Sequence, residues 1–268
     1  MKVAVITGST RGIGYALAEA LLERGCRVVV SGRHEDSVLS AVEHLAMQFG
    51  RSEVQGSACD VRDEASLQAL WDHSVDCFEK VDIWVNNAGV SPHPEKVWKI
   101  ASDEIRSVVD TNILGSVLGT KIAVGAMLQQ GHGAIYLMEG MGSDGRMHDG
   151  LALYGMTKYA LDYFFQAISE ELEDTAVIIG AIRPGMVVTD LITEPYRGRP
   201  EDWARVKPIF NIIADPVGPV CEWMAEAILR NDQNGKTLSR LSRSAMFLRF
   251  LKAPFTKRDL FKDVDLSL

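Results

Sequence analysis

A tyrosine and a lysine four residues apart, Tyr154 and Lys158, are the residues whose types and spacing could move a proton. On a helix, residues at this spacing lie on one face within mutual reach. A free tyrosine titrates near ~10 and is a slow acid at neutral pH, whereas a nearby ammonium favours the phenolate and makes the proton easier to transfer. The pair predicts acid–base chemistry. The same spacing also occurs where a tyrosine is packed and a lysine is exposed.

A glycine-rich segment near the N-terminus predicts a binding site for a pyrophosphate. Glycines allow a tight turn and close backbone approach, and the helix that follows presents free N–H groups to an anion. The alternative is an ordinary turn between a strand and a helix. The segment consists of Gly8, Ser9, Thr10, Arg11, Gly12, Ile13 and Gly14.

The residues after the second predicted strand favour NADPH/NADP+ over NADH. A site specific for NADH has Asp or Glu here to hold the ribose 2′-hydroxyl, but this chain has Ser31, Gly32 and Arg33. The guanidinium of Arg33, with that of Arg11, suits a 2′-phosphate through charge-assisted hydrogen bonds. The alternative is that both arginines are solvated surface charges.

The elements that must position these side chains follow a βαβ pattern, because short β-branched runs alternate with longer amphipathic stretches. The pattern predicts an α/β fold, a Rossmann-type doubly wound parallel sheet of about seven strands with helices on both faces. Helices are expected from about Ile13, His34, Glu64 and Ser102, and over about 153–173. The predicted strands are Val3–Thr7, Arg27–Ser31, Glu53–Ala58, Ile83–Val85, Ala134–Met138, Ala176–Ile182 and Lys236–Leu241.

Residues 1–268 are expected to form a single NAD(P)-binding domain, because the sequence has no repeat or linker. An irregular stretch at about 191–215 is expected to form a lid over the site. A basic, apolar tail at about 240–262 has six cations and no acidic residue between Arg240 and Arg258. Its composition is compatible with an interfacial helix at a membrane, but packing on the domain or on a second subunit is favoured.

Composition excludes several classes of function. Lys and Arg number 28 and Asp and Glu 36, so the net charge is −8 and no nucleic-acid partner is expected. The four cysteines are scattered and the six histidines show no ligand pair, so no metal site is predicted. Residues 1–8 predict a buried strand rather than a signal peptide, and no apolar run approaches the roughly 18 to 20 residues of a membrane span. The expected location is cytoplasmic.

Several motifs in register give the chain a resemblance to the short-chain dehydrogenase/reductases. They are Thr7–Gly14, Asn86–Gly89, Asn112, Tyr154–Lys158 and Pro184–Gly185. The resemblance implies that Tyr154 donates a proton, that Lys158 orients it and binds the nicotinamide ribose, and that Asn112 holds a water in the proton relay. It also implies a small-molecule carbonyl substrate and a homodimer or homotetramer built through the helices that begin near Ser102 and Leu153.

The same resemblance implies further contacts with the cofactor. Asp60 and Val61 correspond to the adenine contact, and the segment from Pro184 to Thr189 closes over the nicotinamide. The full set of implied contacts outside the glycine-rich segment, with Ser31 and Arg33 from the residue types, is Asp60, Val61, Asn87, Ala88, Gly89, Tyr154, Lys158, Pro184, Gly185, Val187 and Thr189.

One position departs from the family pattern. The catalytic serine of the family normally ends the fifth strand, but here that place falls at Glu139 and Gly140. Ser143 is the nearest hydroxyl and is the candidate catalytic serine. The alternative is that backbone N–H groups stabilise the substrate oxygen instead.

The segments 138–146, 183–190 and 210–216 resemble those of the chlorophyll(ide) b reductases of plants, which reduce a formyl group on a tetrapyrrole with NADPH. The expected function is therefore an NADPH-dependent carbonyl reductase that acts on such a formyl group. One alternative is a reductase of 3-oxoacyl groups or small ketones. The other is a regulatory protein that binds NADPH without turnover, and the missing serine is the feature that suggests it.

Overall fold

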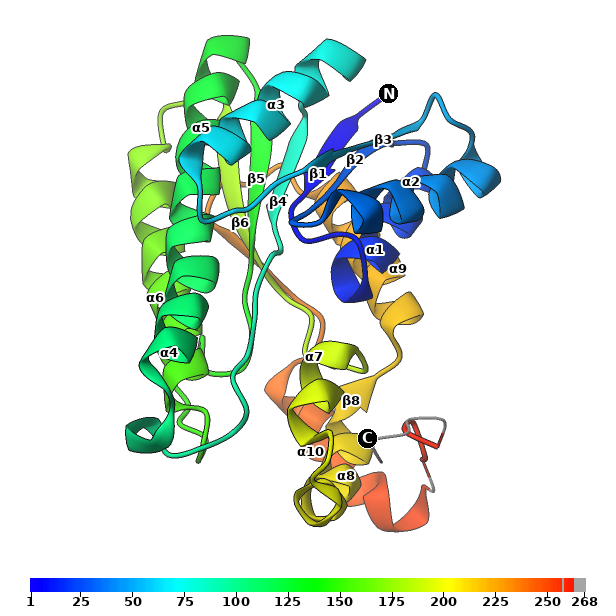
Figure 1. Ribbon diagram of the computed structural model, residues 1–268, viewed down its shortest axis with the longest axis vertical. Helices are drawn as coiled ribbons and strands as arrows, with labels where there is room; N and C mark the ends of the chain where they lie inside the picture. Colours follow the sequence, from blue (N-terminus) through cyan, green and yellow to red (C-terminus); the bar gives the residue numbers. More distant parts are fainter. Residues whose placement is uncertain (257, 263–268) are drawn as a thin grey trace.

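Seven parallel strands form the central sheet of the computed structural model, which describes residues 1–256 and 258–262 (Figure 1). Every neighbouring pair of strands is parallel, as expected for a sheet covered by helices on both faces. The order is β3 (Val54–Ala58), β2 (Arg27–Gly32), β1 (Val3–Ile6), β4 (Ile83–Asn86), β5 (Gly133–Met138), β6 (Val177–Arg183) and β9 (Lys236–Ser239). The predicted fold class is confirmed.

Each face of the sheet buries its own apolar core against three helices. Side chains that alternate along the strands enter one core or the other, so Tyr136 packs on one face and Leu137 on the opposite face. One core is covered by α1 (Gly12–Leu22), α2 (Glu35–Phe49) and α9 (Val217–Arg230). The other is covered by α3 (Glu64–Phe78), α5 (Gly115–Gln130) and α6 (Ala152–Glu171).

Helix α4 (Ser102–Val109) continues through a π-helical turn, Asp110–Leu114, into α5. This run, Ser102–Gln130, is long and apolar enough to cross a membrane by length and composition, so the expectation that no segment meets that test was wrong. Of the 18-residue apolar window in this run, 44% is buried inside the protein. Ala123 and Met127 pack in the core, which is typical of the core helix of an α/β fold.

The segment after β6 forms a layer of its own beyond the carboxyl ends of the strands (Figure 1). Two short strands that the sequence did not predict, β7 (Met186–Val187) and β8 (Ala214–Asp215), pair at its base. Between them lie α7 (Asp190–Thr193), a 3₁₀ turn and α8 (Pro200–Ile213), and we call the whole of 190–215 the lid. Helix α10 (Arg243–Lys252) follows β9 and packs against α8.

The other new features are local. Strand bounds differ from the predicted ones by one or two residues, and α9 was not assigned from the sequence. Short 3₁₀ turns occur at Val97–Lys99, Glu194–Tyr196 and Ala253–Phe255. Lys257, one of the six cations counted in the tail, lies outside the described residues.

Candidate active site

The glycine-rich segment leaves β1 beside β4, at the point where the strand order reverses and where open α/β sheets bind their ligands. The side chains of two serines predicted as cofactor contacts hold its backbone. Ser9 Oγ donates to Ile6 O at 2.6 Å and accepts from Ser31 N at 2.9 Å. Ser31 Oγ donates to Ile6 O at 3.3 Å, so both hydroxyls act within the loop.

Asn87, at the end of β4, ties the same loop to the sheet. Its Nδ2 donates to Thr7 O at 2.8 Å and to Gly8 O at 3.0 Å. A Cβ atom at Gly14 would lie 2.5 Å from that Nδ2, and one at Gly8 would lie 2.9 Å from Ala88 Cα. Gly8 also has a φ of +62°, which side chains disfavour. These glycines are therefore required by close packing as well as by the turn.

The N-terminus of α1 fits an anionic group. Arg11 at the N-cap provides no side-chain hydrogen bond to the helix, so within the described residues the first-turn N–H groups have no side-chain cap. A pyrophosphate would supply that acceptor and would meet the positive end of the helix dipole. The loop, its glycines and this helix end thus fit the dinucleotide predicted from the sequence.

The end that would meet the adenosine carries two arginines. Arg33 is exposed, and no ion pair engages it within 1–256 and 258–262. Arg11 makes an exposed ion pair of 3.4 Å with Asp190 of the lid. Asp60 accepts from Arg62 Nε at 2.9 Å, and the Arg62 hydrogen bond lowers the pKa of Asp60. Val61 packs against Gly115, where a Cβ atom would lie 2.7 Å from Val61 Cγ2.

The segment from Pro184 to Thr189 returns over the glycine loop. A Cβ atom at Gly12 would lie 3.8 Å from Thr189 Cγ2, so the two segments are in contact. Gly185 has a φ of +82° and lies next to Leu241, while Val187 is buried in β7. This is the geometry expected of a segment that closes over a bound nucleotide.

Tyr154 and Lys158 lie one turn apart on α6, as their spacing predicts. Lys158 Nζ is 5.6 Å from the centre of the Tyr154 ring and donates to Met138 O at 2.9 Å. Burial raises the pKa of Tyr154 to about 12 and lowers the pKa of Lys158 to about 8. Among the described residues the Tyr154 hydroxyl makes no hydrogen bond, so it is free to donate to a substrate oxygen.

Asn112 lies in the π-helical turn and is joined to α6 and to the loop after β4. Its Oδ1 accepts from Val90 N at 2.8 Å, and its Nδ2 donates to Val90 O at 2.9 Å and to Thr157 Oγ1 at 3.1 Å. Thr157 in turn donates to Tyr154 O at 2.7 Å. Only Oδ1 keeps capacity for a water. A Cβ atom at Gly89 would lie 3.5 Å from Oδ1 and 3.8 Å from Lys158 Nζ.

Gly140, one of the two residues at the expected position of the family serine, lies beside the Tyr154 hydroxyl. A Cβ atom there would lie 2.5 Å from Tyr154 Oη, so the tyrosine hydroxyl fills the volume of the missing side chain. Ser143 is buried, its N–H donates to Gly140 O at 3.1 Å, and its side chain faces Glu139. No hydrogen bond in the described part of the chain joins Ser143 to Tyr154, and its catalytic role stays a prediction.

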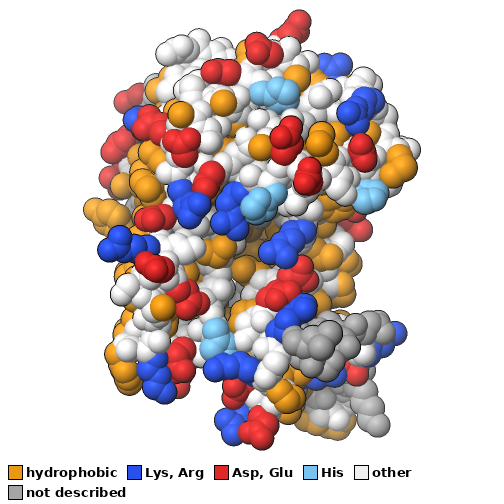
Figure 2. Space-filling view, in the orientation of Figure 1, with side chains coloured by type: hydrophobic (Ala, Val, Ile, Leu, Met, Phe, Trp, Pro, Cys, Tyr) orange, Lys and Arg blue, Asp and Glu red, His pale blue; other side chains and the backbone are white. Residues whose placement is uncertain are grey.

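A cavity of about 470 Å³ opens between the lid and the loops that precede α4 and α6. Figure 2 shows this face hollowed between a lobe over α4 and α6 and a lobe over the lid. His93 lines the cavity and makes a short hydrogen bond through Nδ1 to Pro195 O of the lid. Tyr196 packs edge-on against His93, with ring centres 6.2 Å apart. His148 is exposed.

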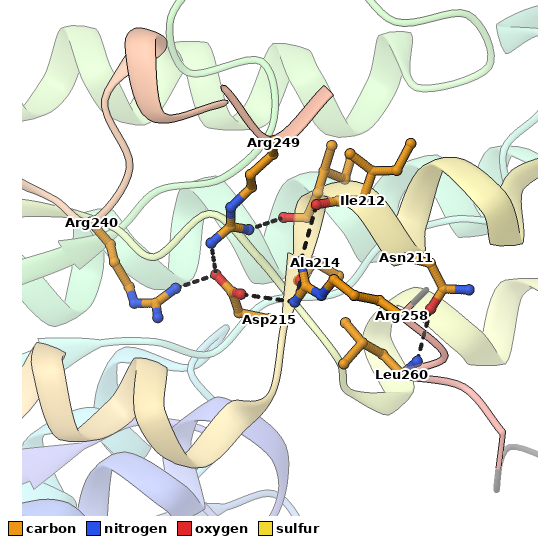
Figure 3. Close-up of polar contacts among 9 residues, drawn as sticks. Asn211, Ile212, Ala214, Asp215, Arg240, Arg249, Arg258 and Leu260 are labelled. Carbon is orange, nitrogen blue, oxygen red and sulfur yellow. Dashed lines mark hydrogen bonds and ion pairs between the residues drawn. The ribbon is translucent and has the colours of Figure 1, made fainter. Parts of the chain in front are cut away.

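Arginines of the tail bind Asp215 at the base of the lid, as Figure 3 shows. Asp215 Oδ2 accepts from Arg249 at 2.8 Å and closely from Arg240, while Oδ1 accepts from Arg258 at 3.2 Å. Arg249 and Arg258 also donate to the carbonyls that end α8, where the helix dipole favours cations. Phe261, 1% exposed, completes an aromatic cluster with Trp203 and Phe210. The tail thus packs on its own domain.

Several of these residues could not be assigned to the site from the sequence. Thr157, Arg183 and Asp215 were not singled out, and Glu139 was noted only because it stands beside the place of the family serine. That departure from the pattern was the one usable signal. The others are ordinary polar residues whose partners are distant in sequence.

Comparison with known proteins agrees with this geometry. A family model described as short chain dehydrogenase matches residues 2–199. The chain is 37% identical over 229 residues to "chlorophyll(ide) b reductase NOL, chloroplastic" of Oryza sativa subsp. japonica, covering 84% of this chain and 65% of that protein. It is 34% identical over 268 residues to the protein of that name from Arabidopsis thaliana, covering 98% and 74%.

Solved structures are also similar. A crystal structure of an actinorhodin polyketide ketoreductase variant with NADPH has a TM-score of 0.80 at 27% sequence identity, over 91% of this chain and 97% of that one. The match spans 65% of the length of the rice relative.

Proposed function

The chain belongs to the short-chain dehydrogenase family and is an NAD(P)H-dependent oxidoreductase, and we propose that it reduces a formyl group on a tetrapyrrole with NADPH. The observation that carries the proposal is the Tyr154 hydroxyl, which makes no hydrogen bond among the described residues and lies beside Lys158 and Gly140. The names of the two plant relatives support the choice of substrate.

In this mechanism the side chains supply the proton and its stabilisation. NADPH, when bound, supplies a hydride to the carbonyl carbon. Tyr154 Oη gives its proton to the carbonyl oxygen, so that the carbonyl becomes an alcohol and a tyrosinate remains. The Lys158 ammonium favours that tyrosinate by its charge. The glycine loop, Asn87 and Thr189 hold the nucleotide in the orientation that the transfer needs.

The preference for NADPH rests on Arg33. The exposed guanidinium of Arg33, which no ion pair engages within residues 1–256 and 258–262, is available for the bidentate hydrogen bonds that a 2′-phosphate accepts. Arg11 is weakly held by Asp190 and can add a second contact. Neither position has the carboxylate that would select the ribose hydroxyl of NADH.

A second substrate class is favoured by one observation. The solved structure with a TM-score of 0.80 is named a polyketide ketoreductase, which supports reduction of 3-oxoacyl groups or small ketones by the same Tyr154 and Lys158. A cavity of about 470 Å³ lies within the ~300–1,000 Å³ typical of small-molecule sites and suits either class.

Assembly and location are also part of the proposal. Met156, Tyr159 and Tyr163 are apolar or aromatic residues exposed along α6, as expected for a helix covered in a homodimer or homotetramer. The molar mass in solution tests this. We propose a cytoplasmic location for the chain.

The test is NADPH oxidation by the purified protein against a formyl-bearing tetrapyrrole, a 3-oxoacyl thioester and simple aldehydes. We expect the tetrapyrrole to be reduced fastest and Tyr154→Phe to lower kcat by about 10²- to 10⁴-fold, because the general acid is lost. The matched control is Tyr163→Phe, on the exposed side of the same helix.

Each other result has a definite meaning. Turnover of the small carbonyls alone would retain the reductase and reject the tetrapyrrole. Tight NADPH binding without reduction of any carbonyl would support the regulatory alternative. Equal losses from Tyr154→Phe and Tyr163→Phe would show that Tyr154 is not the acid.

A further inference from the structure

A buried carboxylate, Glu139, lies directly beside the proposed catalytic pair. It follows the last residue of β5 and precedes Gly140, whose missing side chain is replaced by the Tyr154 hydroxyl. The Glu139 side chain is completely buried, with 0% of its surface exposed. Burying a charge costs several kcal/mol unless it is paired, so this position needs a physical explanation.

Four charged groups come together from the ends of β5 and β6 and from α6. Glu139 and Lys158 are buried, whereas Arg183 and Asp162 are partly exposed. Arg183 Nε donates a short hydrogen bond to Glu139 Oε2, and Arg183 Nη2 donates to Asp162 Oδ1 at 2.6 Å. Asp162 lies one turn beyond Lys158 on α6, as Lys158 lies one turn beyond Tyr154. Two carboxylates and two cations balance in number. Without Glu139 the cluster would carry an excess positive charge.

Half of the Glu139 carboxylate is not committed to Arg183. Among the described residues, Oε1 has no hydrogen-bond partner of ordinary geometry. The Ser143 side chain faces it and lowers its pKa, but burial has the larger effect and raises it. An ion pair to a guanidinium favours the ionised carboxylate, so a negative charge remains next to the lysine.

That charge acts on Lys158. Burial lowers the pKa of the Lys158 ammonium to about 8, and the Glu139 carboxylate opposes this change. Lys158 donates to the carbonyl of Met138, the residue before Glu139, so the same strand end fixes the ammonium and provides its counter-charge. In the described part of the chain, Glu139 is the charged group that acts on Lys158.

We propose that Glu139 is a positioning residue that keeps Lys158 protonated at neutral pH and thereby sets the pH range in which Tyr154 acts. The inference rests on the proposed roles of Tyr154 and Lys158. It gives the residue beside the missing serine a task that a serine does not perform, because it acts through Lys158 by charge.

The other charged groups around Glu139 limit how the test is read. Arg183 faces it from β6, and Asp162 and Lys158 face it from α6. Asp144, in the loop after β5, acts on Arg183 but is held by Arg146 at 3.2 Å. A change at Glu139 therefore acts on Lys158 directly and on Arg183 through a lost ion pair.

The direct test is an NMR titration of Lys158 in isotopically labelled, cofactor-free protein, with the signal assigned by Lys158→Arg. Glu139→Gln keeps the shape and a hydrogen-bonding oxygen but removes the charge. We expect it to lower the pKa of Lys158 by about 1 to 3 pH units, the usual effect of an opposite charge within ~4–6 Å. Glu139→Asp, which keeps the charge, should restore most of the shift.

The matched control is Asp82→Asn. Asp82 is a partly buried carboxylate that is also held by several partners, Val3 N, Lys80 and His132, but it precedes β4, at the opposite end of the parallel strands from Glu139. The Asp82→Asn substitution should leave the pKa of Lys158 unchanged. An equal shift in both variants, or none in Glu139→Gln, would overturn the proposal.

The pH profile of kcat/KM gives the functional reading. In Glu139→Gln the alkaline limb should move to lower pH by the same amount as the pKa of Lys158. An unchanged limb would also reject the proposal. The drop in kcat in Tyr154→Phe tests the proposed function. The NMR titration tests the role of Glu139 separately, because it needs no cofactor and no substrate.

A measurement on the unsubstituted protein applies if Glu139→Gln does not fold. The carboxyl carbon signal of Glu139 should change at the pH at which Lys158 loses its proton, because the two charges interact. A Glu139 signal that does not respond to that titration would reject the coupling.

Discussion

The two buried carboxylates Glu139 and Asp215 are both held by arginine, yet their surroundings differ in charge and in completeness. Both oxygens of Asp215 accept hydrogen bonds, from three guanidiniums. Glu139 accepts at Oε2 from one guanidinium, and its Oε1, which the Ser143 side chain faces, has no partner of ordinary geometry within the described residues. Positive charge is in excess around Asp215, whereas around Glu139 it is balanced only when Lys158 is protonated.

The difference separates the structural role of Asp215 from the positioning role proposed for Glu139. A fully bonded carboxylate fixes the elements around it, and Asp215 joins the base of the lid to β9, α10 and residue 258. At Glu139, by contrast, Oε1 accepts no hydrogen bond of ordinary geometry within the described residues, and the carboxylate acts by its charge on a neighbouring side chain. At the end of β5 that neighbour is the lysine of the proposed catalytic pair.

The largest expected effect is on stability and belongs to Asp215. Asp215→Asn leaves three guanidiniums without their buried counter-charge and should lower the free energy of unfolding by about 3 to 5 kcal/mol. Urea denaturation measures this. The control is Asp259→Asn, whose partner Lys207 is 3.2 Å away and whose side chain is 56% exposed; it should change stability by less than ~0.5 kcal/mol. Similar losses in both variants would contradict the role of Asp215.

The middle effect concerns Arg33, which makes no ion pair in the part of the chain that the structure describes, in contrast to the arginines bound by Asp215. Arg33→Ala should weaken NADPH binding by about 10- to 100-fold, because one hydrogen-bonded charge is worth ~1.5–3 kcal/mol, and should leave NADH binding nearly unchanged. Isothermal titration with each cofactor measures both affinities. Equal weakening for the two cofactors would mean that Arg33 does not recognise the 2′-phosphate.

The smallest effect is a pH dependence that differs between the two clusters, in activity for the Glu139 cluster and in stability for the Asp215 cluster. In the direction of reduction, kcat/KM should fall about tenfold per pH unit above about 8, where Lys158 loses its proton, and should be level below that pH. Burial raises the pKa of Asp215, but the guanidiniums of Arg249 and Arg240 outweigh it and lower that pKa overall. The stability that Asp215 contributes is therefore present above about pH 4 and lost only as acid protonates it.

Activity and stability measured on the same samples test this separation. A free energy of unfolding that falls in parallel with activity near pH 8 would assign the alkaline limb to unfolding rather than to Lys158. A profile that stays flat beyond pH 9 would show that the lysine is not needed as an ammonium.

Much of the frame was predictable because its signals are local. The strand that enters the glycine loop, the four-residue spacing of Tyr154 and Lys158 and the alternation of strands with helices along the chain all follow from periodicity and from residues close in sequence. An excursion was expected at about 191–215 from its prolines and aromatic residues, and α7, a 3₁₀ turn, α8 and β8 occupy 190–215; its role as a lid stays a prediction. The π-helical turn that carries Asn112 was not predicted, since no local pattern marks it.

The sequence by itself determined the sheet, the nucleotide loop and the pairing of Tyr154 with Lys158, because each is encoded within a few neighbouring residues. Only the tertiary structure decided which charges meet. Arg183 reaches Glu139 across 44 residues of sequence, and Arg258 reaches Asp215 across 43. A charged residue has the same appearance in a sequence whether it is solvated or buried against a partner. Its task is set by the elements that the folded sheet brings together.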